Sequence, residues 1–247
     1  MDTVRLHRAP TTVADADEMA RRLDGRLDAS VGVRDRFLAD KDVGRDFAEA
    51  RVLSPYDRET GNTMTGIVRY EERALEDPSR AGGVIYDGYA VQRALYPHAS
   101  DDDGLDIVLL DRALGTWGDD GRWHKRVAVL GRPALISVPG LYEAPAKPDE
   151  YYKEKSKYAM AGGVPPREYL ENKVDGEFLV EDDPRTTDAL EGYALAAYHY
   201  ATEGGAFCDD ERCRLYDAHT QEDVVRAQLR PPEFCDEHAS VYGADAE

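Results

Sequence analysis

The sequence predicts a single α/β domain with a central mixed sheet, one long helix in its second half and a cysteine-containing segment after that helix. Three observations lead to this fold class. Short apolar runs typical of strands alternate with amphipathic helical stretches. The run LDIVLLD at 105–111 is apolar almost throughout, as in a strand that is covered on both faces. All three cysteines lie after residue 207.

Residues 1–100 are predicted to form an N-terminal α/β part. The alternating stretch TVRLHR at its start indicates a strand, and Met19, Leu23 and Leu27 follow at a spacing that places them on one helical stripe. The remaining elements predicted here are strands at 30–38, 65–75 and 82–91, the last passing into a helix, and a short helix at 43–53.

Residues 101–247 form the second predicted part. Its predicted elements are a polar loop at 99–104, strands at 105–111, 127–131 and 133–141, a Gly- and Asp-rich excursion at 115–126, a lid-like crossover at 142–174 and a helix at 186–205. The long helix has the clearest signals. Asp188 with Glu191 three residues later predicts a capping box, and Gly204 predicts the stop.

Charge and composition restrict the partners. The formal net charge is −19, from 50 acidic against 31 basic residues. Because the acids are spread along the chain, nucleic acid is not an expected partner. Dispersed acids, scarce lysine and frequent alanine resemble proteins of halophilic archaea. The sequence shows no long apolar run and no apolar signal segment, so we expect a cytoplasmic protein without a membrane partner.

The cysteines and the last histidine have the spacing of metal ligands, Cys208-x4-Cys213-x21-Cys235-x2-His238. Thiolate and imidazole suit Zn²⁺, and four such ligands close a tetrahedral structural site. An odd number of cysteines argues against a disulfide framework. The spacing predicts a structural zinc site over 208–238, which we call the zinc clasp. The alternative is three buried cysteines and a surface histidine.

The segment between the two ligand pairs is expected to contain a short helix from about Gln221. His219 lies just before it, and its type allows either a spare zinc ligand or a solvated side chain.

This layout resembles the archaemetzincins, metalloproteases whose active-site helix reads HExxHxxGxxHC and is followed by CxxxxC and a later CxxC. The positions of Cys208, Cys213, Cys235 and His238 are similar to those of that family's structural zinc ligands, with histidine in place of the last cysteine. The resemblance covers roughly 105–238. It implies one α/β domain with a metzincin-like long helix, a C-terminal zinc clasp, and an archaeal metallopeptidase family as relatives.

The chain departs from that family where the family cuts peptides. The three catalytic zinc-binding histidines would fall at Ala197, Ala201 and Phe207, and the general-base glutamate at Tyr198. HExxH works because two imidazoles at i and i+4 share a helical face and the glutamate activates the metal-bound water. By that mechanism this chain is not a metalloprotease.

His199 and Glu203 offer a different metal pair. They lie at i and i+4, so they share a helical face and are the candidate catalytic residues and candidate ligands of a possible second metal. A third ligand would come from His124, His219 or Glu143. The alternative is an exposed pair without a function.

Three functions remain open from the sequence. The first is a divergent relative of the metallopeptidases that keeps a cleft for a peptide or protein, with hydrolysis undecided. The second is a non-catalytic, zinc-stabilised binding or regulatory module. The third is an unrelated zinc-containing enzyme that uses Glu143, Lys147 or His124.

Overall fold

The computed structural model describes residues 1–9, 11, 13–39, 41–78, 83–205 and 207–243. Its strands form a five-stranded sheet in the order β2-β1-β4-β8-β7 and a three-stranded sheet in the order β3-β5-β6. The strands are β1 (Thr3–His7), β2 (Ser30–Arg34), β3 (Ile85–Asp87), β4 (Leu105–Leu110), β5 (Ala113–Trp117), β6 (Trp123–Arg126), β7 (Ala128–Val129) and β8 (Ala134–Ser137). The central mixed sheet is confirmed, and the smaller sheet was not predicted.

The helices that the structure describes are α1 (Ala16–Asp24), α2 (Gly44–Glu49), α3 (Thr65–Glu76), α4 (Gly88–Leu95), the 3-10 helix η2 (Tyr96–His98), α5 (Val138–Glu143), α6 (Asp149–Met160), α7 (Arg167–Lys173), α8 (Thr186–Glu203), α9 (Gln221–Leu229) and α10 (Asp236–Tyr242). The short helices expected near 43–53 and after Gln221 are present as α2 and α9.

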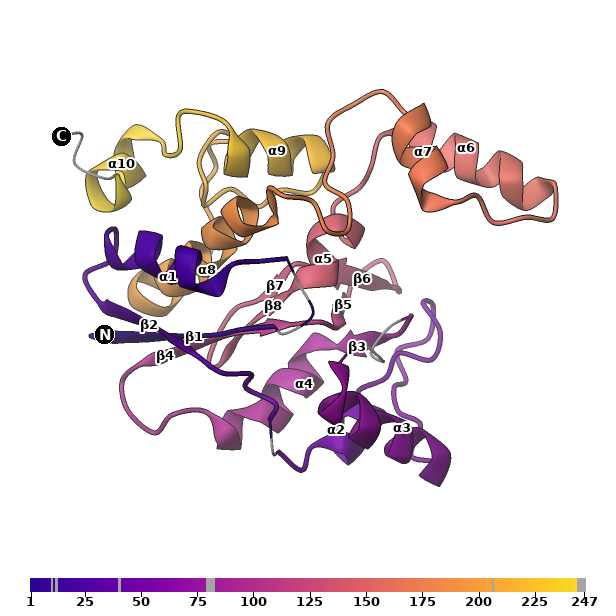
Figure 1. Cartoon of the computed structure of the whole chain (residues 1–247), viewed down its shortest axis with the longest axis horizontal. Coiled ribbons are helices and arrows are strands. Elements are labelled where there is room, and N and C mark those ends of the chain that lie inside the picture. Colours follow the sequence, from indigo (N-terminus) through magenta and orange to yellow (C-terminus); the bar gives the residue numbers. More distant parts are fainter. Residues whose placement is uncertain (10, 12, 40, 79–82, 206, 244–247) are drawn as a thin grey trace.

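The central sheet lies between two layers of helices (Figure 1). Strands β2, β1, β4 and β8 are parallel, and β7 runs antiparallel to β8 at the edge. Every residue of β4 is buried. Ile107 and Leu109 belong to the core that contains α1 and α8, whereas Val108 and Leu110 belong to the core that contains α2 and α4. Side chains alternate between the faces of a strand, so covering both faces requires the uninterrupted apolar run.

Helix α8 ends as predicted and begins differently. Gly204 has a φ of 75° and closes the helix in the left-handed conformation that glycine adopts without strain. The predicted capping box of Asp188 and Glu191 is wrong, because the helix begins at Thr186 after Arg185 and has no side-chain cap. The carboxylates of Asp188 and Glu191 instead pair with arginines of other segments.

One predicted strand is helical, and another is shorter than predicted. The stretch at 65–75 forms α3, and its buried residues Glu71, Ala74 and Leu75 have helical spacing. The β-branched residues at its start favour a strand locally, but burial of this face decides the outcome. The strand predicted at 133–141 ends at Ser137, whose hydroxyl caps α5 by accepting from the Gly140 N–H at 2.8 Å.

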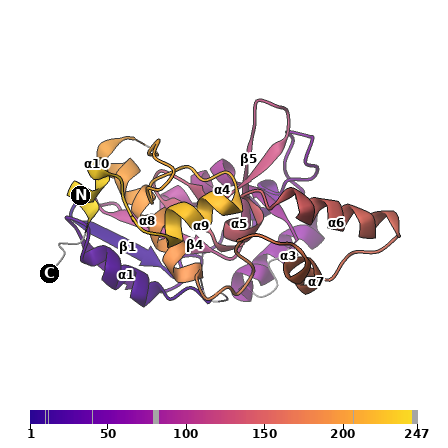
Figure 2. The ribbon, with the colours of Figure 1, turned by 90° about the horizontal axis from the view of Figure 1, so that it is seen from above.

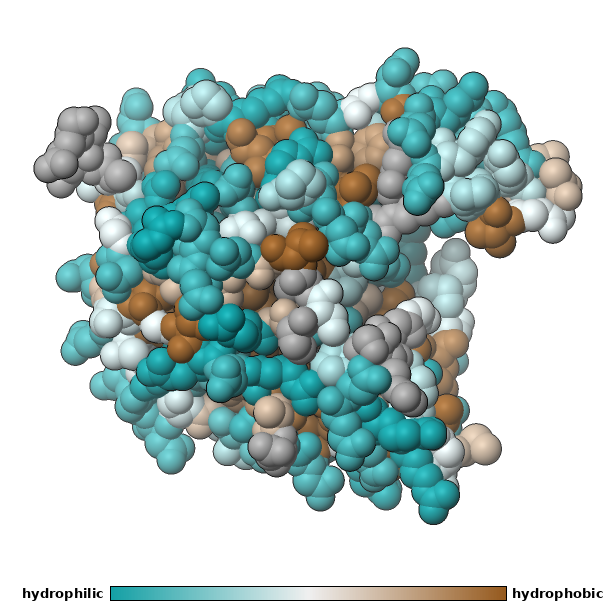
Figure 3. Space-filling model, viewed as in Figure 1, coloured by the Kyte–Doolittle hydropathy of each residue, from teal (hydrophilic) through white to brown (hydrophobic). Residues whose placement is uncertain are grey.

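The lid-like crossover at 142–174 contains helices α6 and α7, which extend together away from the body as an arm (Figures 1 and 2). Helix α6 has no buried residue. The space-filling view shows a mostly hydrophilic face and a hollow beneath this arm (Figure 3). Within the described ranges, no helix combines the length and the apolar character needed to span a membrane.

Candidate functional site

The zinc clasp begins directly after α8. Cys208 follows the turn at Gly204, and its N–H donates to the Leu215 carbonyl at 2.8 Å. The Cys213 N–H donates to Asp210 at 3.0 Å, which closes a tight turn. Cys235 occupies the N-cap position of α10, and His238 lies in the first turn of that helix. Two distant segments therefore deliver the two ligand pairs.

The four candidate ligands meet at one point. Their ligand atoms all lie within 4.8 Å of one another. The Sγ atoms of Cys208 and Cys235 are 3.8 Å apart, and the His238 Nδ1 lies 3.6 Å from the Cys213 Sγ and 3.1 Å from the Cys235 Sγ. A tetrahedral zinc ion spaces sulfur and nitrogen ligands by roughly 3.5–3.8 Å. The residues that the spacing selected thus fit a zinc ion in type and number, and their separations are close to those that such an ion needs.

Burial disfavours the thiolate form of the cysteines in this cluster. Cys213 is fully buried. Burial, together with the neighbouring thiols of Cys213 and Cys235, raises the pKa of Cys208 to about 12. Burial also raises the pKa of Cys213. A divalent ion held by these four residues would supply the positive charge that favours the thiolate form.

The structure places His199 behind the clasp. Its Nδ1 lies 3.0 Å from the Tyr242 hydroxyl, and its ring meets the His238 ring edge-on with centroids 5.2 Å apart. Burial and the neighbouring His238 lower the pKa of His199. Glu203 is exposed at the end of α8. Within the described residues only the clasp groups three or more ligand atoms, so no third ligand joins His199 and Glu203 there.

The other candidates are engaged in separate contacts. The His124 Nε2 lies 2.8 Å from Asp120. The Glu143 carboxylate pairs with Lys125. The Lys147 amine donates to the Leu179 carbonyl at 3.1 Å and lies over the Phe178 ring. His219 is exposed and 3.6 Å from Asp217. These residues do not form one catalytic cluster.

A groove of about 610 Å³ runs along one side of α8. Seven consecutive residues, His124–Leu130, line one wall. This segment contains part of β6 and all of β7, each of which is a terminal strand of its sheet. The groove is also lined by Tyr193 and Tyr200 of α8, Phe207, Pro145 and His219. The sequence analysis did not find this groove, because its walls come from segments far apart in the chain.

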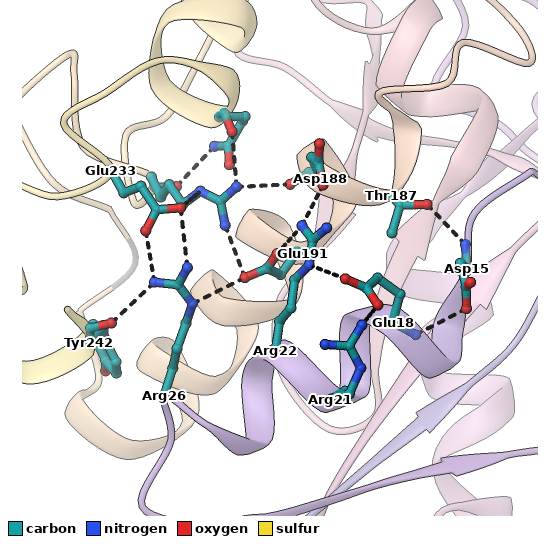
Figure 4. A network of polar contacts seen from close by, with 12 residues as sticks. Asp15, Glu18, Arg21, Arg22, Arg26, Thr187, Asp188, Glu191, Glu233 and Tyr242 are labelled. Atoms are coloured by element: carbon teal, nitrogen blue, oxygen red, sulfur yellow. Dashed lines mark hydrogen bonds and ion pairs between the residues drawn. The ribbon is translucent and has the colours of Figure 1, made fainter. Parts of the chain in front are cut away.

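The opposite side of α8 carries a buried charge network (Figure 4). Glu191 is 1% exposed and lies within 3.3 Å of the Arg22 and Arg26 guanidinium groups of α1. Its carboxylate is also 3.0 Å from Arg214. Arg214 directly follows Cys213, and its N–H donates to the Glu233 carbonyl at 2.9 Å, two residues before Cys235. The network therefore joins α1 and α8 to both clasp segments.

Comparison with known proteins adds the following. A family model described as a family of unknown function (DUF7001) matches residues 5–241. The structure of archaemetzincin from Methanopyrus kandleri is similar at 14% identity and a TM-score of 0.48, over 98% of this chain and 93% of that chain. A zinc-dependent peptidase from Methanocorpusculum labreanum is similar at 12% identity and a TM-score of 0.45, over 97% and 99%. No curated protein matches the chain.

Proposed function

We propose that this chain, which belongs to the family of unknown function DUF7001, is a zinc-stabilised protein that binds extended peptides without cutting them. The observation that carries the proposal is the separation of two features on α8. The metal cluster gathers after the end of the helix, whereas the groove lies along its side.

The donor set supports a structural role for the metal. Three thiolates and one imidazole fill all four positions of a tetrahedral zinc ion. A catalytic zinc ion keeps one position open for water or substrate. The clasp residues would hold zinc and supply folding free energy, because ligands from two segments are ordered by one ion.

The groove supports peptide binding. The outermost strands of the two sheets, β6 and β7, follow each other directly along one groove wall. An extended peptide adds to such an edge through main-chain hydrogen bonds, while pockets between the walls accept its side chains. Tyr193, Tyr200 and Phe207 also line the groove and offer aromatic surface to a ligand.

The side chains of α8 argue against hydrolysis. The resemblance to archaemetzincins assigns the catalytic ligands to Ala197, Ala201 and Phe207 and the base to Tyr198. Alanine and phenylalanine have no metal-binding atom, and a tyrosine is not a carboxylate base. We therefore propose binding as the function of the groove.

Retention of peptides by the immobilised full chain tests the proposal. The probe is an N-acetylated mixture of seven-residue peptides with a free C-terminus and randomised sequence. We expect a subset to be retained and recovered intact by mass spectrometry, and retention to fall about tenfold in a Tyr200→Ala, Phe207→Ala double variant. Tyr96→Ala, which removes an exposed tyrosine outside the groove, is the control. No retained peptide, or recovery of cleaved peptides, contradicts the proposal.

Metal content tests the second part of the proposal, the structural zinc ion. Elemental analysis of untagged protein is expected to give one zinc per chain, lost in Cys213→Ser and kept in His199→Ala. A zinc ion that survives Cys213→Ser would place the metal elsewhere.

A further inference from the structure

Basic residues of strand β6 line the groove. Successive side chains of a strand point to opposite faces, so His124 and Arg126 share one face of the β5–β6 pair. Thr116 of β5, directly opposite His124, lies on the same face. All three residues line the groove. The Arg126 Nε donates to the Thr116 hydroxyl at 2.7 Å, which fixes the direction of the guanidinium.

Carboxylates of the segments that line or adjoin the groove are paired with bases other than Arg126. Asp120 contacts His124 and Arg122 at 2.8 and 2.6 Å, and these contacts lower the pKa of Asp120. Glu143 pairs with Lys125. Asp217, which also lines the groove, lies 3.6 Å from His219.

Arg126 itself has no carboxylate within ion-pair distance in the ranges that the structure describes. Its side chain is only partly exposed. The chain has 50 acidic and 31 basic residues, so acidic residues outnumber the basic residues that could pair with them. The absence of a carboxylate partner for Arg126 among the described residues is unexpected in such a chain. A guanidinium that is held by one hydrogen bond keeps its remaining N–H donors for another acceptor.

We infer that Arg126 binds a carboxylate of the peptide in the groove. The inference rests on the proposed function. A guanidinium recognises a planar carboxylate with two parallel N–H···O bonds, and this pairing gains strength where the surroundings exclude water. The nearby walls, which include Val127, Val129 and Phe207, suit an apolar side chain next to that carboxylate. The C-terminus of the peptide joins these two features in one residue.

Matched peptide mixtures test the inference on the full chain. One N-acetylated seven-residue mixture ends in a free carboxylate, a second ends in an amide, and a third ends in an amide but carries glutamate as its last residue. We expect the free acid to be retained about tenfold more than the plain amide, as a charge-assisted pair implies. Recovery of retention by the third mixture would assign the carboxylate to a side chain and still support Arg126 as its partner.

Single-residue variants test whether the preference for free-acid peptides depends on Arg126. Arg126→Gln is expected to bring acid and amide within about twofold of each other, and Arg126→Lys to keep part of the preference. Arg122→Gln, an exposed arginine of the neighbouring turn, should keep the parental preference. Melting curves that match the parent confirm that the variants fold.

The results distinguish a failure of the inference on Arg126 from a failure of the proposed peptide binding. Equal retention of acid and amide by the parent overturns the inference and leaves peptide binding in place. A preference that persists in Arg126→Gln also overturns it. If the parent retains none of the three mixtures, the proposed function fails as well.

Discussion

The two sides of α8 use arginine in opposite ways. On the side that faces α1, Arg214 is 5% exposed, lies 3.0 Å from Glu191 and donates to the Gln228 carbonyl at 3.1 Å. On the groove side, the partly exposed Arg126 has its one side-chain partner within the described ranges in a neutral hydroxyl. Only one of these guanidinium groups therefore meets its counter-charge within the described part of the chain.

The difference separates structure from binding. A buried charge whose counter-charge comes from the same chain fixes how segments pack, and losing one partner leaves the other charge unsatisfied. A charge without an internal partner adds little to folding and is available to a ligand. The same residue type therefore predicts a stability defect on one side of α8 and a binding defect on the other.

The largest expected effect is loss of the clasp metal. Cys235→Ser removes one of four ligands, and structural zinc contributes folding free energy on the order of 10 kcal/mol in small zinc domains. We expect the free energy of unfolding, measured by urea denaturation, to fall by at least about 5 kcal/mol. His199→Ala, which keeps all four ligands, is the control and should cost about 1–2 kcal/mol. Equal losses would show that the clasp is not the main support of this region.

The second largest effect is expected in the buried charge network around Glu191. Arg214→Gln leaves Glu191 with a weaker set of partners in a site that is 1% exposed. Breaking one partner of a buried ion pair costs about 3–5 kcal/mol. We expect a loss near the lower end, because Arg22 and Arg26 remain.

Glu203→Gln, an exposed carboxylate at the end of the same helix, is the matched control and should change the free energy of unfolding by less than about 0.5 kcal/mol. If Arg214→Gln is equally mild, the comparison between the two sides of α8 loses its basis.

Asp106 tests whether a buried charge that has its partner within the chain also stabilises the fold away from α8. Burial alone raises its pKa, but hydrogen bonds with His7 and Ser100 outweigh burial and hold the pKa of Asp106 at about 2. The unfolded chain has a pKa near 3.9. The stabilisation is therefore complete above about pH 5 and is lost as the pH falls towards 2.

The measurable quantity is the acid limb of stability. We expect Asp106→Asn to remove about 2 kcal/mol at pH 7 and almost none at pH 2, by urea denaturation across this range. A loss that is independent of pH would mean that packing, not ionisation, makes Asp106 important.

Sequence reasoning succeeded where one segment determines the result. The run at 105–111 predicted a doubly covered strand, because burial on both faces leaves its mark on consecutive residues. Gly204 predicted the end of α8, because the turn needs a positive φ. The spacing of the cysteines and His238 selected four residues that the fold brings together, because chelation by short-range pairs is also a local pattern.

The same reasoning failed where distant segments decide. The spacing of Asp188 and Glu191 resembles a capping box, but arginines from α1 and the clasp compete for these carboxylates. The local sequence at 65–75 favours a strand. In the structure this stretch is helical, and Arg51 and Arg112 pair with Glu71 on the buried face of the helix. The groove and the unpaired state of Arg126 follow only from the packed structure, since they depend on which carboxylates have other partners.

Apart from the control substitutions, the smallest change in the free energy of unfolding is expected for Arg126→Gln, and it is the most direct test of the comparison between the two sides of α8. Arg126→Gln removes one charge and one bond to Thr116, and glutamine keeps much of the aliphatic stem. We expect the free energy of unfolding to change by less than about 1 kcal/mol by urea denaturation at neutral pH, well below the loss in Arg214→Gln. A loss as large as that of Arg214→Gln would give Arg126 a structural role and contradict the assignment of its charge to a ligand. A small loss, together with loss of the preference for free acids, would show that the two sides of α8 divide the arginines between folding and binding.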